Sequence, residues 1–203
     1  PEHLKQGANV ATNVYHAANT YKRFPSLVAY STNNVGKNAK GAGSFRDNSN
    51  NIYNFVATKT DIHQLASGTF TSRKSSLTGG ETDFFTFTQF GNYVIASNGV
   101  DQPQYYLMGT STNFANLNAI QTAGTTPLFR VSGVVRDFLV VGNITNATNR
   151  IQWSGINDIT VWTGKQADYQ DLPGSGGKIV HVTSGEIGYV FRQNQIVRMD
   201  YVG

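Results

Sequence analysis

The sequence predicts an all-β protein, a partial β-propeller-like arrangement of short antiparallel blades, on three observations. Short apolar runs rich in β-branched and aromatic residues alternate with turn clusters of Gly, Asn and Asp. No stretch has the length and the 3.6-residue spacing of a long amphipathic helix. Strand pairs recur roughly every 40 to 50 residues, which is typical of propeller blades. The aromatic residues that mark the first strand of each pair are Tyr53, Tyr93, Phe138 and Tyr189.

The most complete module lies between Arg130 and Trp162. Val134, Val135 and residues 138–141 form a short apolar, β-branched run, residues 142–149 form a polar turn cluster, and Ile151 begins a second alternating run. This pattern predicts two antiparallel strands, and residues 159–162 predict a third. A β-sandwich with long hairpins is the competing architecture, and it would give weaker periodicity.

The N-terminal quarter of the chain is the least regular part. Residues 1–50 predict an extended arm and a first edge strand, because Pro25 interrupts the strand-like run 21–30 and proline lacks a ladder donor. Residues 51–203 predict the propeller-like domain, which we expect to be incomplete at its C-terminal end.

The remaining elements follow from local patterns. Residues 68–74 read as a strand, and residues 83–90 alternate phenylalanine with threonine, as a half-buried strand does. Residues 109–126 predict a long loop or one short helix, and residues 166–177 predict a turn-rich connection. The expected structural core comprises Tyr53, Phe85, Phe87, Tyr93, Phe138, Trp153, Trp162 and Tyr189.

Composition narrows the functional classes. The 203 residues include no cysteine, so neither a disulfide nor a thiolate metal site or nucleophile is available. Charged residues make up only 14% of the chain, and the net charge of +4 is scattered rather than concentrated, unlike that of a charge-driven nucleic-acid module. No apolar stretch approaches the roughly 20 residues that span a bilayer.

Catalytic and ligand-binding patterns are weak. The four histidines are far apart in sequence, and Glu81 with Asp83 is the clearest carboxylate pair, at a spacing that is ordinarily solvated. Residues 174–177 resemble half of a phosphate loop, but the Lys-Ser/Thr and the helix that such a loop requires do not follow. We therefore expect no catalytic residue, no metal site and no cofactor.

Several segments together resemble the tail-nozzle, or packaged-DNA-stabilisation, proteins of tailed, chiefly short-tailed, bacteriophages. The resemblance extends from about Asn13 to Gly203. It is carried by residues 13–15, 22–27, 90–100, 103–104, 135–142, 152–155, 167–168 and 185–186.

This resemblance implies a non-enzymatic virion protein whose β-propeller protomers assemble as a ring, most often six-fold, in the phage tail. Such a ring lies below the portal and adaptor, around the DNA exit channel, and helps to retain and then release the packaged genome. Double-stranded DNA would pass through without specific binding, and the protein would be made in the host cytoplasm. Other tail proteins are the expected partners.

Candidate contacts with neighbouring subunits or the adaptor lie in the arm and in the two long loops. They are Tyr21, Lys22, Arg23, Phe24, Pro25, Asn113, Phe114, Tyr169 and Asp171.

A carbohydrate-binding or carbohydrate-cleaving tail module is the main alternative, because Trp153, Trp162 and the tyrosine-rich strands could stack on sugars. Exposure of both tryptophans in one groove beside two carboxylates would favour that function. A propeller lectin is a weaker alternative, since it should repeat its aromatic site in each blade.

Overall fold

The computed structural model describes residues 12–26 and 28–201 and divides the chain into two compact units, Pro1–Thr32 and Asn33–Gly203. Residues 1–50 were predicted to form an arm with a first edge strand near residues 21–30. Strand β3 (Gly41–Arg46), which was not predicted, belongs to the second unit, because it pairs along its whole length with β4. The division between the units therefore lies after residue 32 and not after residue 50.

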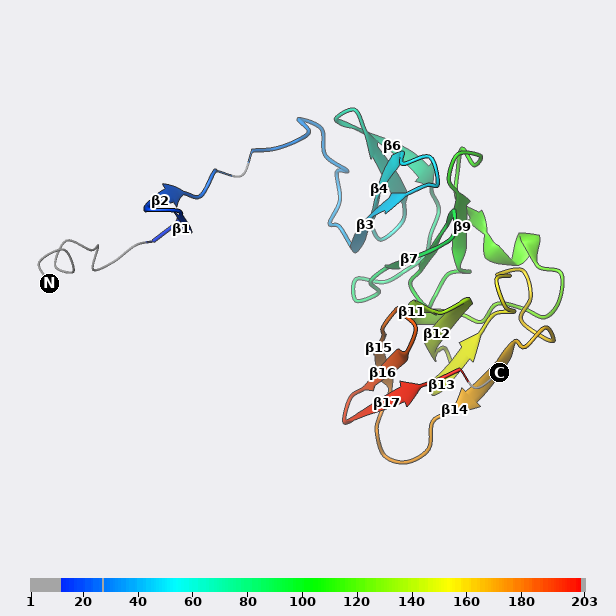
Figure 1. Cartoon of the computed structure of the whole chain (residues 1–203). Helices are drawn as coiled ribbons and strands as arrows, with labels where there is room; N and C mark the ends of the chain where they lie inside the picture. Colours follow the sequence, from blue (N-terminus) through cyan, green and yellow to red (C-terminus); the bar gives the residue numbers. More distant parts are fainter. Residues whose placement is uncertain (1–11, 27, 202–203) are drawn as a thin grey trace, which may run out of the picture. The chain divides into compact units, whose positions relative to one another are not determined.

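The first unit contains one β-hairpin (Figure 1). Strands β1 (Val14–Ala17) and β2 (Thr20–Arg23) are antiparallel, with Val14 opposite Arg23. A further hydrogen bond, from the Phe24 amide to the Asn13 carbonyl at 2.9 Å, extends the ladder beyond the strands. Pro25 follows directly and has no amide hydrogen to continue the ladder, so the hairpin ends there.

The second unit is built from four antiparallel sheets in which sequential strands are neighbours (Figure 1). The first sheet comprises β3, β4 (Ile52–Ala57), β5 (Ile62–Ala66) and β6 (Thr69–Lys74); the second comprises β7 (Thr86–Phe90), β8 (Tyr93–Ser97), β9 (Gln104–Leu107) and β10 (Ala115–Asn116). The third comprises β11 (Phe129–Val135), β12 (Phe138–Ile144), β13 (Ala147–Trp153) and β14 (Asp168–Asp171); the fourth comprises β15 (Ile179–Val182), β16 (Gly188–Arg192) and β17 (Gln195–Met199). One short 3₁₀ helix, η2 (Leu117–Ile120), follows β10.

The first strands of successive sheets lie side by side. Strand β3 contacts β7, β7 contacts β11, and β11 contacts β15. The hydroxyl of Thr86 in β7 donates to the carbonyl of Arg130 in β11 at 2.7 Å. A Cβ atom on Gly133 of β11 would lie 2.8 Å from the Val182 carbonyl of β15, so only glycine allows this close approach. Sheets that meet along their first strands are the blades of a propeller.

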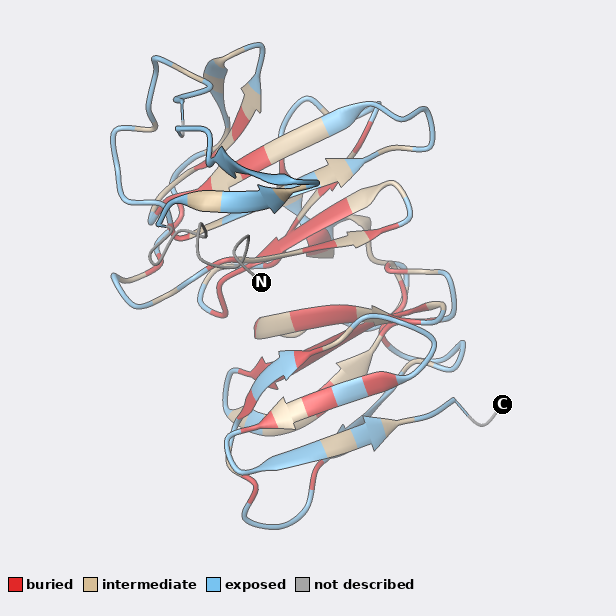
Figure 2. Ribbon diagram, turned by 60° about the vertical axis from the view of Figure 1, so that its left-hand side comes forward, coloured by how far each residue is buried: buried red, intermediate tan, exposed pale blue. Residues whose placement is uncertain are grey.

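Each pair of successive sheets encloses a hydrophobic core (Figure 2). The first core lies between the first and second sheets, around Phe55 and Tyr106. The second lies between the second and third sheets, around Ile95 and Leu139, and the third lies between the third and fourth sheets, around Val140 and Ile179. All seven residues of β12 are buried, because this strand packs against both the second and the third cores.

The expected fold class is confirmed, because the chain is all-β with several four-stranded antiparallel sheets in a partial propeller-like arrangement. Two element predictions were wrong. Residues 159–162 form turns and one isolated bridge rather than a strand, and the fourth strand of that sheet, β14, lies inside the segment expected to be a turn-rich connection. Residues 109–126 contain the expected short helix as η2.

Most of the expected core aromatics pack as predicted. Phe85, Phe138 and Trp162 are buried, while Tyr53, Phe87, Tyr93 and Trp153 are half-buried against one of the three cores.

Tyr189 is the exception, since 41% of it is exposed. Gly188, Val190 and Arg192 of β16 point inward, and the two-residue period of a strand therefore turns Tyr189 outward.

Among the described residues, no helix is long and apolar enough to cross a membrane.

Candidate functional site

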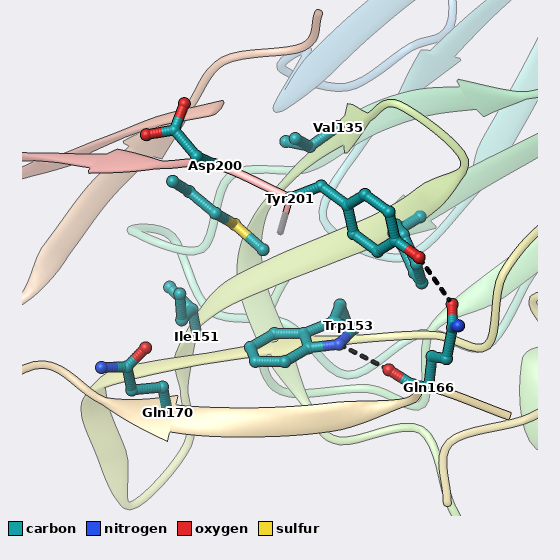
Figure 3. A pocket seen from close by; sticks show the side chains of 9 residues that line it. Val135, Ile151, Trp153, Gln166, Gln170, Asp200 and Tyr201 are labelled. Atoms are coloured by element: carbon teal, nitrogen blue, oxygen red, sulfur yellow. Dashed lines mark hydrogen bonds between the residues drawn. The ribbon is translucent and has the colours of Figure 1, made fainter. Parts of the chain in front are cut away.

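An apolar pocket lies at the third core, between the third sheet and the segment after β17 (Figure 3). Its volume is about 320 Å³. The apolar wall comes from β11, β12, β13 and β17, and the polar edge comes from β14, the segment before it and the segment after β17. The lining residues are Val135, Phe138, Ile151, Trp153, Gln166, Gln170, Met199, Asp200 and Tyr201.

Two aromatic side chains of the pocket are held through Gln166. The Trp153 indole donates its Nε1 hydrogen to the Gln166 carbonyl at 2.8 Å, and the Tyr201 hydroxyl lies 3.3 Å from Gln166 Oε1 (Figure 3). The Tyr201 ring also packs against Phe138, with the ring centroids 5.6 Å apart, and the Arg136 guanidinium lies 5.1 Å from its centroid. The pocket therefore presents aromatic faces whose positions are fixed by hydrogen bonds.

Asp200 is the single carboxylate among the residues that line the pocket, and it forms an ion pair with Arg198 at 2.9 Å. Paired acid and base catalysis needs two carboxyl groups with different pKa values at one site. The described residues contain no cluster of three or more Asp, Glu or His side chains that could hold a metal ion. This pocket is suited to binding an apolar or aromatic group rather than to acid–base chemistry.

The outward face of β14 brings together two of the predicted contact residues, Tyr169 and Asp171. The Arg150 guanidinium donates to both carboxylate oxygens of Asp171, at 2.7 and 2.8 Å, and lies 4.0 Å from the Tyr169 ring centroid. The hydrogen bonds from Arg150 lower the pKa of Asp171, and the same interaction raises the pKa of Arg150. The result is an ordered, exposed patch of charge and aromatic surface on an edge strand.

Asn113 and Phe114, the other two predicted contact residues of the long loops, differ in burial. Asn113 is exposed, but Phe114 is only 4% exposed and packs in the first core against Phe55, with ring centroids 4.9 Å apart. The expectation that Phe114 contacts a neighbour was wrong. A phenylalanine surrounded by polar residues in a loop is expected to lie at the surface. The course of the loop backbone, which the local sequence does not show, places this side chain in the core.

The predicted contacts in the arm are all exposed. Tyr21 and Phe24 are 60% and 59% exposed, and Lys22, Arg23 and Pro25 are exposed as well. The Tyr15 ring packs edge-on against the Phe24 ring at 5.5 Å, which orders the aromatic face of the hairpin.

Sequence reasoning missed Gln166, Gln170 and Tyr201 as pocket residues. Gln170 lies on β14, whose four residues are polar or exposed and carry no alternating pattern, so local sequence did not indicate that strand. Gln166 and Tyr201 come from segments outside the strands that are far apart in sequence, so no local pattern could have paired them.

No protein-family model matches the chain, and no curated protein matches it in sequence. Solved structures match its fold. The computationally designed Ika4 protein is similar with a TM-score of 0.55 and 13% identity, over 88% of this chain and 100% of the designed chain. A chain in the crystal structure of the mitotic checkpoint complex is similar with a TM-score of 0.54 and 12% identity.

The second similarity covers 88% of this chain and 55% of the checkpoint chain, so the protein spans about half the length of that neighbour. At these identities the similarity concerns the fold alone. Together with the four sheets and the contacts between their first strands, it defines a propeller-like β protein.

Proposed function

We propose that this protein is a structural subunit of a bacteriophage tail nozzle, which forms a ring around the DNA exit channel below the portal and adaptor. In this role it is a virion component without enzymatic activity, and it helps to retain and then release the packaged genome. The observation that carries the proposal is a compact propeller-like unit joined to a hairpin, in a unit of its own, whose aromatic and basic side chains are exposed. The residues that resemble nozzle proteins lie in both units.

The ionic surface supports passage of DNA without tight binding. Affinity for DNA grows with each Lys or Arg that reaches a phosphate. In the described part of the chain, many of these cations already face carboxylates. These cations are Lys37, Lys40, Lys59, Arg130, Arg136, Arg150, Lys165 and Arg198.

The test is the mass and symmetry of the assembly formed by the full chain, measured by mass photometry and particle imaging. We expect a closed ring with a central channel, most simply six-fold. A protein that remains monomeric at every concentration would contradict the proposal.

A carbohydrate-binding tail module is the second candidate, and the pocket beside Trp153 favours it. The indole face, the two glutamine side chains and Asp200 offer the stacking and hydrogen-bonding groups that sugars use. Trp162, in contrast, is only 3% exposed, so the two tryptophans do not share a groove. The single pocket carboxylate argues for binding rather than cleavage.

Quenching of tryptophan fluorescence across a glycan panel tests this alternative. Binding that is lost in Trp153→Ala and retained in Tyr189→Ala would support it. An absence of binding by the assembled protein would leave the structural role as the better account.

A further inference from the structure

A second pocket, polar rather than apolar, lies at the outer strand of the first sheet, where β6 meets the segment between β9 and β10. Its volume is about 360 Å³. Strand β6 is the strand of its sheet furthest from β3, so this pocket lies away from the contacts between first strands. We call it the polar pocket, and its lining residues are Ser72, Arg73, Lys74, Ser75, Asn113 and Phe114.

A β-bulge explains why neighbouring residues of β6 line the same pocket. The two successive residues of β5 at positions 62 and 63 lie opposite Lys74 and Ser72. Arg73 is therefore an extra residue with no partner across the ladder. Consecutive side chains of a regular strand point to opposite faces, and a bulge redirects the side chain of the extra residue. Arg73 and Lys74 thus line one space instead of two faces.

The two cations of the polar pocket have no acidic partner. Among the described residues, neither Arg73 nor Lys74 forms an ion pair. Lys74 Nζ lies 3.5 Å from Asn116 Oδ1, which is a long contact with a neutral group. The two segments that contain the pocket, residues 62–80 and 102–136, include no Asp or Glu. The pocket therefore carries positive charge that no carboxylate of the described chain contacts.

The carboxylates of the adjoining segments are engaged with other groups. Lys40 and Lys59 both pair with Glu81, at 3.1 and 3.2 Å. Asp101 accepts hydrogen bonds from the amide and the hydroxyl of Thr78, at 2.9 and 2.6 Å. The cations of the polar pocket are therefore available to an anion from outside the chain.

Hydrogen-bond donors accompany these charges. Arg73 Nε donates to Gln64 Oε1 at 2.9 Å, and Gln64 is only 9% exposed, so a buried side chain orients the guanidinium. The terminal nitrogens of Arg73 have no hydrogen-bond partner among the described residues, and the same holds for the side chains of Ser75 and Asn113. A guanidinium, an ammonium, a hydroxyl and a side-chain amide thus border one space.

We infer that the polar pocket binds a phosphate group, either as inorganic phosphate or as the phosphoryl group of a small phosphorylated molecule. The planar fork of an arginine and the ammonium of a lysine form strong charge-assisted hydrogen bonds with phosphate oxygens. Two cations also balance the charge of about −1.5 to −2 that a phosphoryl group carries at neutral pH. This site goes beyond the proposed nozzle role and does not depend on ring assembly, because one chain supplies all its residues.

Isothermal titration calorimetry of the full chain at low ionic strength tests the site, with inorganic phosphate, O-phosphoserine and acetate as separate probes. We expect phosphate compounds to bind and acetate to bind about tenfold more weakly, because acetate has one charge and fewer acceptor oxygens. Tighter binding of inorganic phosphate would identify the free anion as the ligand, and tighter binding of O-phosphoserine would identify a phosphorylated molecule.

Single substitutions locate the binding at the polar pocket. Arg73→Gln and Lys74→Gln should each weaken phosphate binding about tenfold, as expected for the loss of a charge-assisted hydrogen bond. The matched control is Lys178→Gln, which removes an exposed cation that also forms no ion pair among the described residues, and it should change the affinity less than about twofold. Ser75→Asp adds a carboxylate to the pocket without removing a hydrogen bond within the described chain, so it should abolish binding in a folded protein.

Four results would overturn the inference. They are no binding of either phosphate compound, an equal loss of affinity in Lys178→Gln, full affinity in Ser75→Asp, and acetate binding as tight as that of phosphate. Binding of duplex DNA that depends on Arg73, when neither phosphate compound binds, would also overturn it in favour of contact with a nucleic-acid backbone. A chain that remains monomeric and binds phosphate through Arg73 would contradict the proposed ring and leave this site standing.

Discussion

The cores on either side of the second sheet end in a buried aromatic side chain, whereas the core between the third and fourth sheets ends in a pocket. The three boundaries between successive sheets are alike on one side, because the first strands of the two sheets are in contact at each boundary. The difference lies at the outer side, where Phe114 and Trp162 close the first two cores and Tyr201 only lines the third. The side chains of Phe114 and Trp162 therefore stabilise the first two cores, whereas Tyr201 borders a pocket of about 320 Å³ at the third.

The largest expected effect comes from removing one of the two aromatic side chains, Phe114 or Trp162, that fill the ends of the first two cores. Trp162→Ala should lower the free energy of unfolding by about 3–5 kcal/mol, because it leaves a cavity in a packed core. Phe114→Ala should have a similar effect. Urea unfolding followed by circular dichroism measures both.

The exposed Tyr189 provides the control for these two variants. Tyr189→Ala should change stability by less than about 0.5 kcal/mol. If Trp162→Ala and Tyr189→Ala were equally mild, the stability of the second core would not depend on Trp162.

The same enlargement should have opposite effects in a filled core and in the open one. Met108 is 3% exposed in the first core, so Met108→Phe should overpack it and cost about 1–3 kcal/mol. Met199 lines the pocket, and Met199→Phe should fill space and add about 0.5–2 kcal/mol. Thermal unfolding of the two variants tests this contrast, and equal destabilisation would show that the third core is already full.

The smallest expected effect concerns pH. Hydrogen bonds from the Gly80 amide and, second, from Arg130 lower the pKa of Asp83 in the folded protein. The ionised Asp83 side chain therefore stabilises the folded state at pH values above the unfolded pKa of about 4. This contribution is lost as the pH falls below that value toward the folded pKa. The Asp83–Arg130 ion pair, at 2.7 Å, ties the connection before β7 to β11. Between the third and fourth sheets there are neutral bonds, such as Asn143 Nδ2 to the Ile179 carbonyl at 2.8 Å, and one longer ion pair, between Arg136 and the exposed Glu186 at 3.6 Å.

Asp83→Asn should therefore be less stable at neutral pH and should lose less stability than the parent between about pH 4 and pH 2. Unfolding curves at several pH values measure this difference. Ser184→Ala, which removes a neutral bond between the third and fourth sheets, is the control and should leave the shape of the pH profile unchanged.

Local patterns predicted much of the strand content. The alternation in residues 83–90 predicted a strand there, and β7 lies within that segment, because the conformation of a strand depends largely on the pattern of its own side chains. The recurrence of aromatic strands every 40 to 50 residues or so was enough to predict a propeller-like fold.

Other features depended on contacts between residues far apart in the chain. Strand β14 exists because it pairs with β13, although residues 168–171 read as part of a polar connection. Nothing local distinguishes the buried Phe114 from the exposed Phe24, since both lie among polar residues.

The sequence by itself determined an all-β chain of short hairpins, with an arm, low charge density and no thiol chemistry. The tertiary structure decided which aromatics close the cores, that Tyr189 faces outward, and that Trp153, Gln166 and Tyr201 form one pocket. The physical reason is that strand propensity acts over a few residues, whereas burial depends on which sheets meet.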